Sequence, residues 1–123
     1  MNQAAAMGKV LVVDDWRDSA ESLAMLLNSA GYETATAYNG AQAVELAKSF
    51  QPDTVILDIN MPVMDGHQAA RELRQTLPDR HLILVALTAL DQGTRPDSLS
   101  DFDLYLQKPC DTALLLRLIS HLH

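Results

Sequence analysis

The chain has very little cysteine, few aromatic residues and no long apolar run. Cys110 is the only cysteine among 123 residues, which excludes an internal disulfide and fits a reducing cytoplasm. No stretch approaches the roughly 20 apolar residues that a membrane span needs. The first seven residues lack the positive start and the apolar core of a signal peptide. We therefore expect a cytoplasmic protein with no membrane partner.

Basic residues are also scarce. The chain carries 9 Lys and Arg against 16 Asp and Glu, a net charge of -7, which argues against the phosphates of nucleic acids as a direct partner. The rest of the composition, 48% hydrophobic and 20% charged, is ordinary for one globular domain with its own core. We expect residues 8–123 to form this domain and residues 1–7 to form a flexible N-terminal arm or linker.

Short apolar runs alternate with helix signals along the chain. The runs predict strands of a parallel sheet at Lys9–Val13, Glu33–Ala37, Asp53–Asp58, Leu82–Thr88 and Asp103–Gln107. Helices are expected between them, at Arg17–Ala30, after the capping residue Asn39, at His67–Leu77 and from about Asp111 onward. Repeated strand–helix units imply right-handed crossovers, so we expect a doubly wound α/β fold with helices on both faces of the sheet.

The helix expected before the last strand is weak. Residues 91–101 contain Gly93 and Pro96, which are unfavourable inside a helix, and they offer a single aliphatic side chain. Since proline is compatible with a first helical turn, we predict an atypical, short or irregular fourth helix at about 96–101.

Polar side chains stand at the ends of four of the predicted strands. They are Asp14 and Asp15 after the first, Asp58 at the end of the third, Thr88 at the end of the fourth and Lys108 after the fifth. Ligands of open α/β sheets bind outside the carboxyl ends of the strands, so we expect these residues to meet at one edge. Crowded carboxylates repel one another and favour a hard cation such as Mg²⁺. A hydroxyl and an ammonium suit an anion. The sequence predicts a site for a divalent metal and a phosphoryl group.

With its context, this set of residues resembles the receiver domain of two-component response regulators. The resemblance covers about residues 8–122, and the matching stretches are 10–15, 53–66, 86–89 and 105–109. It implies a flavodoxin-like sheet of five parallel strands in the order 2-1-3-4-5, with the first and third strands as neighbours. Phe102-Asp103 and the stretch 18–27 further resemble receivers that are joined to hybrid histidine kinases.

The resemblance also implies which residues bind the metal. Asp15 and Asp58 resemble the carboxylates that bind Mg²⁺ directly, together with the backbone carbonyl of Asn60. Asp14 resembles the acid that holds the water shell of the metal. Asp58 is at the same time the residue that resembles the phosphoryl acceptor.

Further residues are implied to act on the phosphoryl group. Thr88 and Lys108 resemble the residues that contact its oxygens, and Tyr105 resembles the switch residue that turns inward when Thr88 moves. The implied donor is a phosphohistidine on a histidine kinase or on a histidine phosphotransfer domain.

Two other functions fit the sequence less well. A receiver that binds partners without phosphorylation typically lacks one or more of the five residues, and here all five are present. An aspartate-nucleophile phosphatase carries Asp-x-Asp-x-Thr after its first strand, whereas Asp58-Ile59-Asn60 follows the third strand and lacks the second acid. We therefore expect no enzyme beyond Mg²⁺-dependent self-phosphorylation and autodephosphorylation, unless the full-length protein is a hybrid kinase. We expect the isolated domain to be a monomer.

Overall fold

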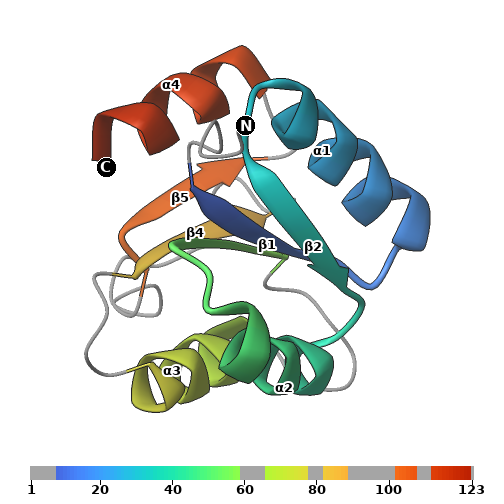
Figure 1. Ribbon diagram of the computed structural model, residues 1–123. Coiled ribbons are helices and arrows are strands. Elements are labelled where there is room, and N and C mark those ends of the chain that lie inside the picture. Colours follow the sequence, from blue (N-terminus) through green and yellow to red (C-terminus); the bar gives the residue numbers. More distant parts are fainter. Residues whose placement is uncertain (1–7, 59–65, 78–81, 89–101, 108–111, 123) are drawn as a thin grey trace.

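The computed structural model describes residues 8–58, 66–77, 82–88, 102–107 and 112–122, which form five strands and four helices (Figure 1). In chain order these are β1 (Lys9–Val13), α1 (Arg17–Ser29), β2 (Glu33–Ala37), α2 (Gly40–Phe50), β3 (Thr54–Asp58), α3 (Gly66–Thr76), β4 (Ile83–Thr88), β5 (Leu104–Gln107) and α4 (Thr112–Leu122). The strands form one parallel sheet in the order β2-β1-β3-β4-β5. The predicted α/β class and strand order are confirmed.

Several predictions concern parts of the chain outside the described residues. They are the N-terminal arm at 1–7, the short helix at 96–101 and the site residues Asn60 and Lys108. The helix predicted from about Asp111 is α4. Among the helices that are described, none has the length and apolar character needed to cross a membrane.

The helices cover the sheet in two layers, with α1 and α4 on one face and α2 and α3 on the other (Figure 1). Alternate side chains of the strands point to opposite layers, as the two-residue period of a strand requires. Leu11 and Leu57 are fully buried on the α2–α3 side, whereas Val12 and Ile56 are buried on the α1–α4 side. Burial on both faces explains why β1 and β3 are continuous apolar runs in the sequence.

Asp53 sets the start of two neighbouring strands. Its Oδ2 accepts a hydrogen bond from the Lys9 backbone N–H at 2.9 Å, and its own N–H donates to the Lys9 carbonyl at 2.8 Å. Gly8 has a φ of +148°, and a Cβ there would stand 3.3 Å from Asp53 Oδ2, so glycine fits both the backbone and the space. The Lys9 N–H is thus bonded to a side chain rather than to a backbone carbonyl, and β3 begins at Thr54, one residue later than predicted.

Asp103 has a similar position before β5, which also begins one residue later than predicted, at Leu104. Its Oδ2 accepts hydrogen bonds from the Leu84 backbone N–H at 2.8 Å and from Arg74 Nη2 at 2.9 Å. Arg74 Nη1 in turn donates to the Leu82 carbonyl at 3.1 Å. The pair therefore joins the end of α3 to the starts of β4 and β5.

Replacing Asp103 by alanine tests the contribution of this pair to stability. Asp103→Ala leaves the part-buried Leu84 N–H without its acceptor and Arg74 without its carboxylate, so the free energy of unfolding should fall by about 1–3 kcal/mol. Urea titration measures the loss. The control is Lys48→Ala, which breaks the exposed ion pair to Glu45 and should cost at most about 0.5 kcal/mol. Equal losses in the two variants would mean that Asp103 is a surface residue only.

Burial of Tyr32 generates a prediction for alkaline pH. The side chain is 4% exposed in the layer below α1, and desolvation raises the pKa of its phenol above the ordinary value of 10.0. The unfolded chain therefore releases this proton first, so the stability that Tyr32 contributes is complete below pH 10.0 and is lost as the pH rises through the raised pKa. Urea titrations at several alkaline pH values should show a shallower decline in Tyr32→Phe than in the wild type. An identical decline in both proteins would assign the effect to other groups.

Candidate acidic metal centre

The site is built at the carboxyl ends of the two central strands. In the β1–β3 pair Val13 lies opposite Leu57, so the next positions of the two strands carry Asp14 and Asp58 at the same edge. With Asp15 they form a cluster in which one carboxylate oxygen from each residue lies within 4.8 Å of the others. Asp14 is 3% exposed and Asp58 is 6% exposed, whereas Asp15 faces solvent. The structure therefore brings together the three acids predicted for the metal.

The turn that carries Asp14 and Asp15 is fixed by hydrogen bonds of the backbone and of the Asp14 side chain. The Asp14 N–H donates to the Ala37 carbonyl at 3.1 Å, which joins the end of β1 to the end of β2. Asp14 Oδ1 accepts from the Trp16 N–H at 3.0 Å, and the Trp16 carbonyl accepts from Ala20 N–H at 3.1 Å as α1 begins. Asp14 thus forms part of the helix start as well as part of the cluster.

The backbone register also places the predicted phosphoryl-binding positions at this edge. Asp58 lies opposite Leu87 in the β3–β4 pair, so Thr88 is the next residue of β4 after the one that faces Asp58. Thr88 itself lies opposite Gln107 in the β4–β5 pair. For Thr88 and Tyr105 the described structure includes the strand backbone but not the side chain. Their predicted roles, and that of Lys108 after Gln107, stay predictions.

The chemistry of the cluster fits a hard divalent cation. Three negatively charged carboxylates within 4.8 Å repel one another, and two of them are removed from water that would otherwise screen them. A cation relieves this repulsion, and the donor set consists of oxygen atoms alone, which suits Mg²⁺ or Ca²⁺ better than softer metals. The exposed side at Asp15 leaves room for water ligands, which Mg²⁺ retains in most protein sites.

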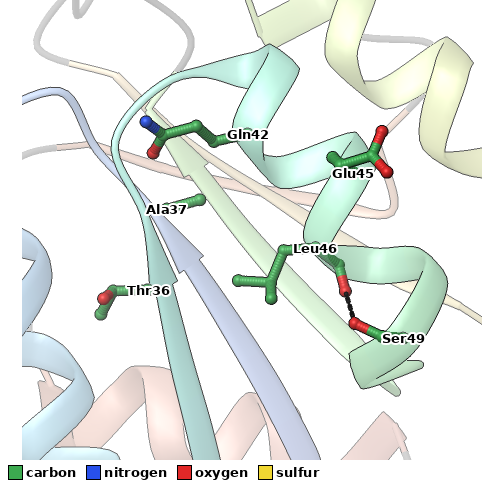
Figure 2. A pocket seen from close by; sticks show the side chains of 6 residues that line it. All are labelled: Thr36, Ala37, Gln42, Glu45, Leu46 and Ser49. Atoms are coloured by element: carbon green, nitrogen blue, oxygen red, sulfur yellow. Dashed lines mark hydrogen bonds between the residues drawn. The ribbon is translucent and has the colours of Figure 1, made fainter.

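The described structure also contains a hollow beside β2. It is a groove of about 430 Å³ between β2 and α2, lined by Thr36, Ala37, Gln42, Glu45, Leu46 and Ser49 (Figure 2). Ser49 Oγ donates to the Leu46 carbonyl at 3.2 Å, and Glu45 pairs with Lys48 at 3.3 Å. Glu45 is therefore the single acidic residue that lines the groove, which does not resemble the metal cluster.

One group of residues beside the acids is not predicted by the sequence pattern. Arg17 and Glu21, both in the first turns of α1, contact the side chain of Tyr38, which follows β2. The available signal was an aromatic residue directly after the second predicted strand, together with a charged pair at i and i+4 on the predicted helix. This pattern carries no chemistry of its own, and only the packing of α1 against β2 makes it a contact.

The strand order and the cluster define a flavodoxin-like α/β domain with an acidic site at the carboxyl ends of its strands. The family model of the response regulator receiver domain matches residues 10–120, and the chain belongs to this family. The predicted family and its phospho-acceptor role in two-component signalling are thereby confirmed.

Curated relatives are similar over most of this chain. It is 38% identical to the response regulator PleD of Caulobacter vibrioides over 112 residues, 87% of this chain but 24% of PleD. It is 33% identical to the protein PilH of Pseudomonas aeruginosa over 119 residues, 93% of this chain and 96% of PilH. The chain therefore spans about a quarter of one relative and nearly all of the other.

Solved structures agree with the fold. The response regulator TrrA of Thermotoga maritima, solved in complex with Mg²⁺ and BeF, is 34% identical with a TM-score of 0.84, over 95% of this chain and 100% of that one. A CheY-like receiver domain from Methylobacillus flagellatus superimposes with a TM-score of 0.87 at 24% identity, covering 96% of this chain and 100% of that one, and supports the fold alone.

Removing one charge from the cluster should stabilise the metal-free protein. Asp15→Asn keeps the shape of the side chain and relieves repulsion with Asp14 and Asp58, so the free energy of unfolding in EDTA should rise by up to about 1 kcal/mol. Asp18→Asn, an exposed acid in the first turn of α1, is the matched control and should give no gain. Urea titration in EDTA compares the two variants. A loss of stability in Asp15→Asn would contradict the picture of mutual repulsion.

Proposed function

We propose that Asp58 accepts a phosphoryl group from a phosphohistidine, with Mg²⁺ bound by Asp15, Asp58 and the carbonyl of Asn60, and with Asp14 holding the water shell. The observation that carries this proposal is the meeting of the three carboxylates at the ends of β1 and β3. Asp58 is one of the two buried acids, and it ends the central strand β3, whose pairing on both sides fixes the backbone position of this residue. A fixed carboxylate suits in-line attack, which depends mainly on positioning and charge neutralisation.

The proposed transfer forms a P–O bond to Asp58 and breaks the P–N bond of the donor. An Asp58 carboxylate oxygen attacks phosphorus, the P–N bond to the donor imidazole breaks, and the imidazole nitrogen keeps the bonding electrons and takes up a proton. Bound Mg²⁺ would supply neutralisation of the charge on the phosphoryl oxygens. Water later attacks phosphorus, which releases inorganic phosphate and restores the Asp58 carboxylate.

Thr88, Lys108 and Tyr105 complete the proposal. The hydroxyl of Thr88 donates to a phosphoryl oxygen, and the ammonium of Lys108 binds another as a point charge. The position of Thr88 supports this role, because Thr88 directly follows Leu87, which lies opposite Asp58 in the β3–β4 pair. Movement of Thr88 toward the phosphoryl group is then followed by inward rotation of Tyr105 on the neighbouring strand, where Tyr105 lies opposite Ala86.

The donor is proposed to be a histidine kinase or a histidine phosphotransfer domain in the cytoplasm. Receiver domains of this family interact with such proteins, and the chain matches the family over most of its length. We propose no catalytic activity for this domain beyond its own phosphorylation and dephosphorylation. An association with a hybrid histidine kinase stays a prediction.

Labelling by a small phosphodonor tests the acceptor. Wild-type protein incubated with Mg²⁺ and acetyl phosphate should gain one phosphoryl group per chain, visible as a mass increase, while Asp58→Asn should gain none because the amide is not a nucleophile at phosphorus. Asp18→Asn is the matched control, since it removes an exposed carboxylate from the same edge of the fold, and it should label fully. Full labelling of Asp58→Asn would refute the assignment, and turnover of the donor with no accumulated phosphoryl group on the wild type would favour a phosphatase.

The activated domain is predicted to stay largely monomeric. The sequence of residues 91–101 offers a single aliphatic side chain, which leaves little apolar surface there for a symmetric dimer. Sedimentation velocity with and without beryllofluoride and Mg²⁺ measures the association state. A tight dimer that forms on activation and is abolished by Leu99→Ser would show that this segment is an interface.

A further inference from the structure

Residues of the first turns of α1 contact the side chain of Tyr38 beside the acid cluster. The guanidinium carbon of Arg17 lies 4.1 Å from the centre of the Tyr38 ring. Glu21 Oε2 accepts a hydrogen bond from the Tyr38 hydroxyl at 2.9 Å and lies 3.9 Å from Arg17 Nη1. Tyr38 directly follows β2, and α1 lies against β2 (Figure 1). The contact therefore links α1 to β2 at the edge of the sheet where the acids meet, because α1 begins and β2 ends there.

The Tyr38 hydroxyl is held from a second side as well. Its oxygen lies 2.9 Å from Thr36 Oγ1, and the Tyr38 backbone N–H donates to Gln42 Oε1 at 2.9 Å. The Tyr38 side chain is thus bonded to β2 and to α1, and its backbone to the start of α2, although the Arg17 and Glu21 side chains are 66% and 51% exposed. The Tyr38 ring therefore has a fixed position, and the guanidinium of Arg17 packs on its face, since aromatic faces attract guanidinium groups.

This contact determines where the positive charge of Arg17 lies. Arg17 is two residues beyond Asp15, so their Cα atoms are at most about 7 Å apart. A guanidinium released from Tyr38 can reach the Asp14 or Asp15 carboxylates from there, and guanidinium pairs with carboxylates in bidentate geometry. Such an ion pair would occupy the oxygen atoms that a divalent cation needs.

We propose that Tyr38, assisted by Glu21, holds Arg17 away from the acid cluster and so keeps Asp14 and Asp15 available to a divalent cation. The inference rests on the proposed function, because it takes Mg²⁺ to bind at the cluster. Tyr38 is a positioning residue in this account: it touches neither metal nor phosphoryl group and acts through Arg17 alone. Loss of the ring therefore weakens metal binding, because the released Arg17 guanidinium then competes with the metal for the carboxylates.

Calorimetric Mg²⁺ titration of a double-mutant cycle tests the proposal, with Trp16 emission as a second signal. Tyr38→Ala should raise the Mg²⁺ dissociation constant two- to fivefold, because the competing exposed ion pair is worth at most about 1 kcal/mol and 1.4 kcal/mol corresponds to tenfold. Tyr38→Phe keeps the ring and should bind nearly as the wild type does. Adding Arg17→Ala to Tyr38→Ala should restore the wild-type constant, while Arg17→Ala alone should change it less than twofold.

The cycle separates this role from structural support and from general electrostatics. A damaged fold would not be repaired by removing a second side chain, so failure of Arg17→Ala to restore binding would overturn the proposal. An equal gain from Arg17→Ala in both backgrounds would also overturn it, because additive effects mean that Tyr38 does not control Arg17. Lys48→Ala removes the same charge from the exposed pair with Glu45 and should leave the constant unchanged in both backgrounds.

Two further arms complete the test. If Tyr38→Ala does not fold, Tyr38→Leu takes its place, since it fills space without an aromatic face, and the same cycle applies. Absence of Mg²⁺ binding in the wild type, or binding that survives in Asp15→Ala, would refute the proposed function together with this inference. Normal binding in the wild type and equally tight binding in the Tyr38 variants would refute the inference alone.

Discussion

Parallel pairing of β1 with β3 is the constraint on which the site depends. The backbone register fixes Val13 opposite Leu57, so the residues that follow, Asp14 and Asp58, end at the same edge whatever their charges are. A slip of one residue would turn every buried side chain of a strand toward the wrong helical layer. Because both faces of the central strands are buried, the apolar layers enforce the position of the acids.

The magnitudes show why this arrangement persists despite repulsion. Each fully buried Leu, Ile or Val contributes about 1.5–3 kcal/mol, whereas two unit charges 4 Å apart repel by about 4 kcal/mol at the effective dielectric constant typical of a protein surface. Many such side chains are fully buried around the central strands. The core therefore holds the carboxylates together with a wide margin, and the remaining repulsion favours a cation. The same principle applies at Tyr38, where packing of α1 against β2 decides the position of an exposed charge.

Much of the fold followed from local patterns. Apolar runs located all five strands, and the acids at strand ends predicted the cluster, because both signals are local and the sheet topology then brings them together. The strand order came from resemblance to a family. Three strands begin one residue later than predicted, after Asp53, Leu82 and Asp103. At Asp53 and Asp103 a side-chain carboxylate accepts a backbone N–H of the neighbouring strand. Contacts between elements, such as Arg17 on Tyr38, depend on how a helix crosses a strand, which no local pattern encodes.

The central claim is that the sheet builds one divalent-cation site from Asp14, Asp15 and Asp58. Anomalous diffraction from a crystal in which Mn²⁺ replaces Mg²⁺ tests it most directly, because Mn²⁺ accepts the same oxygen ligands and its position is seen without reference to activity. The account predicts a single strong peak in contact with the carboxylates of Asp15 and Asp58. A strong peak at another acidic group, with none between these two residues, would contradict it.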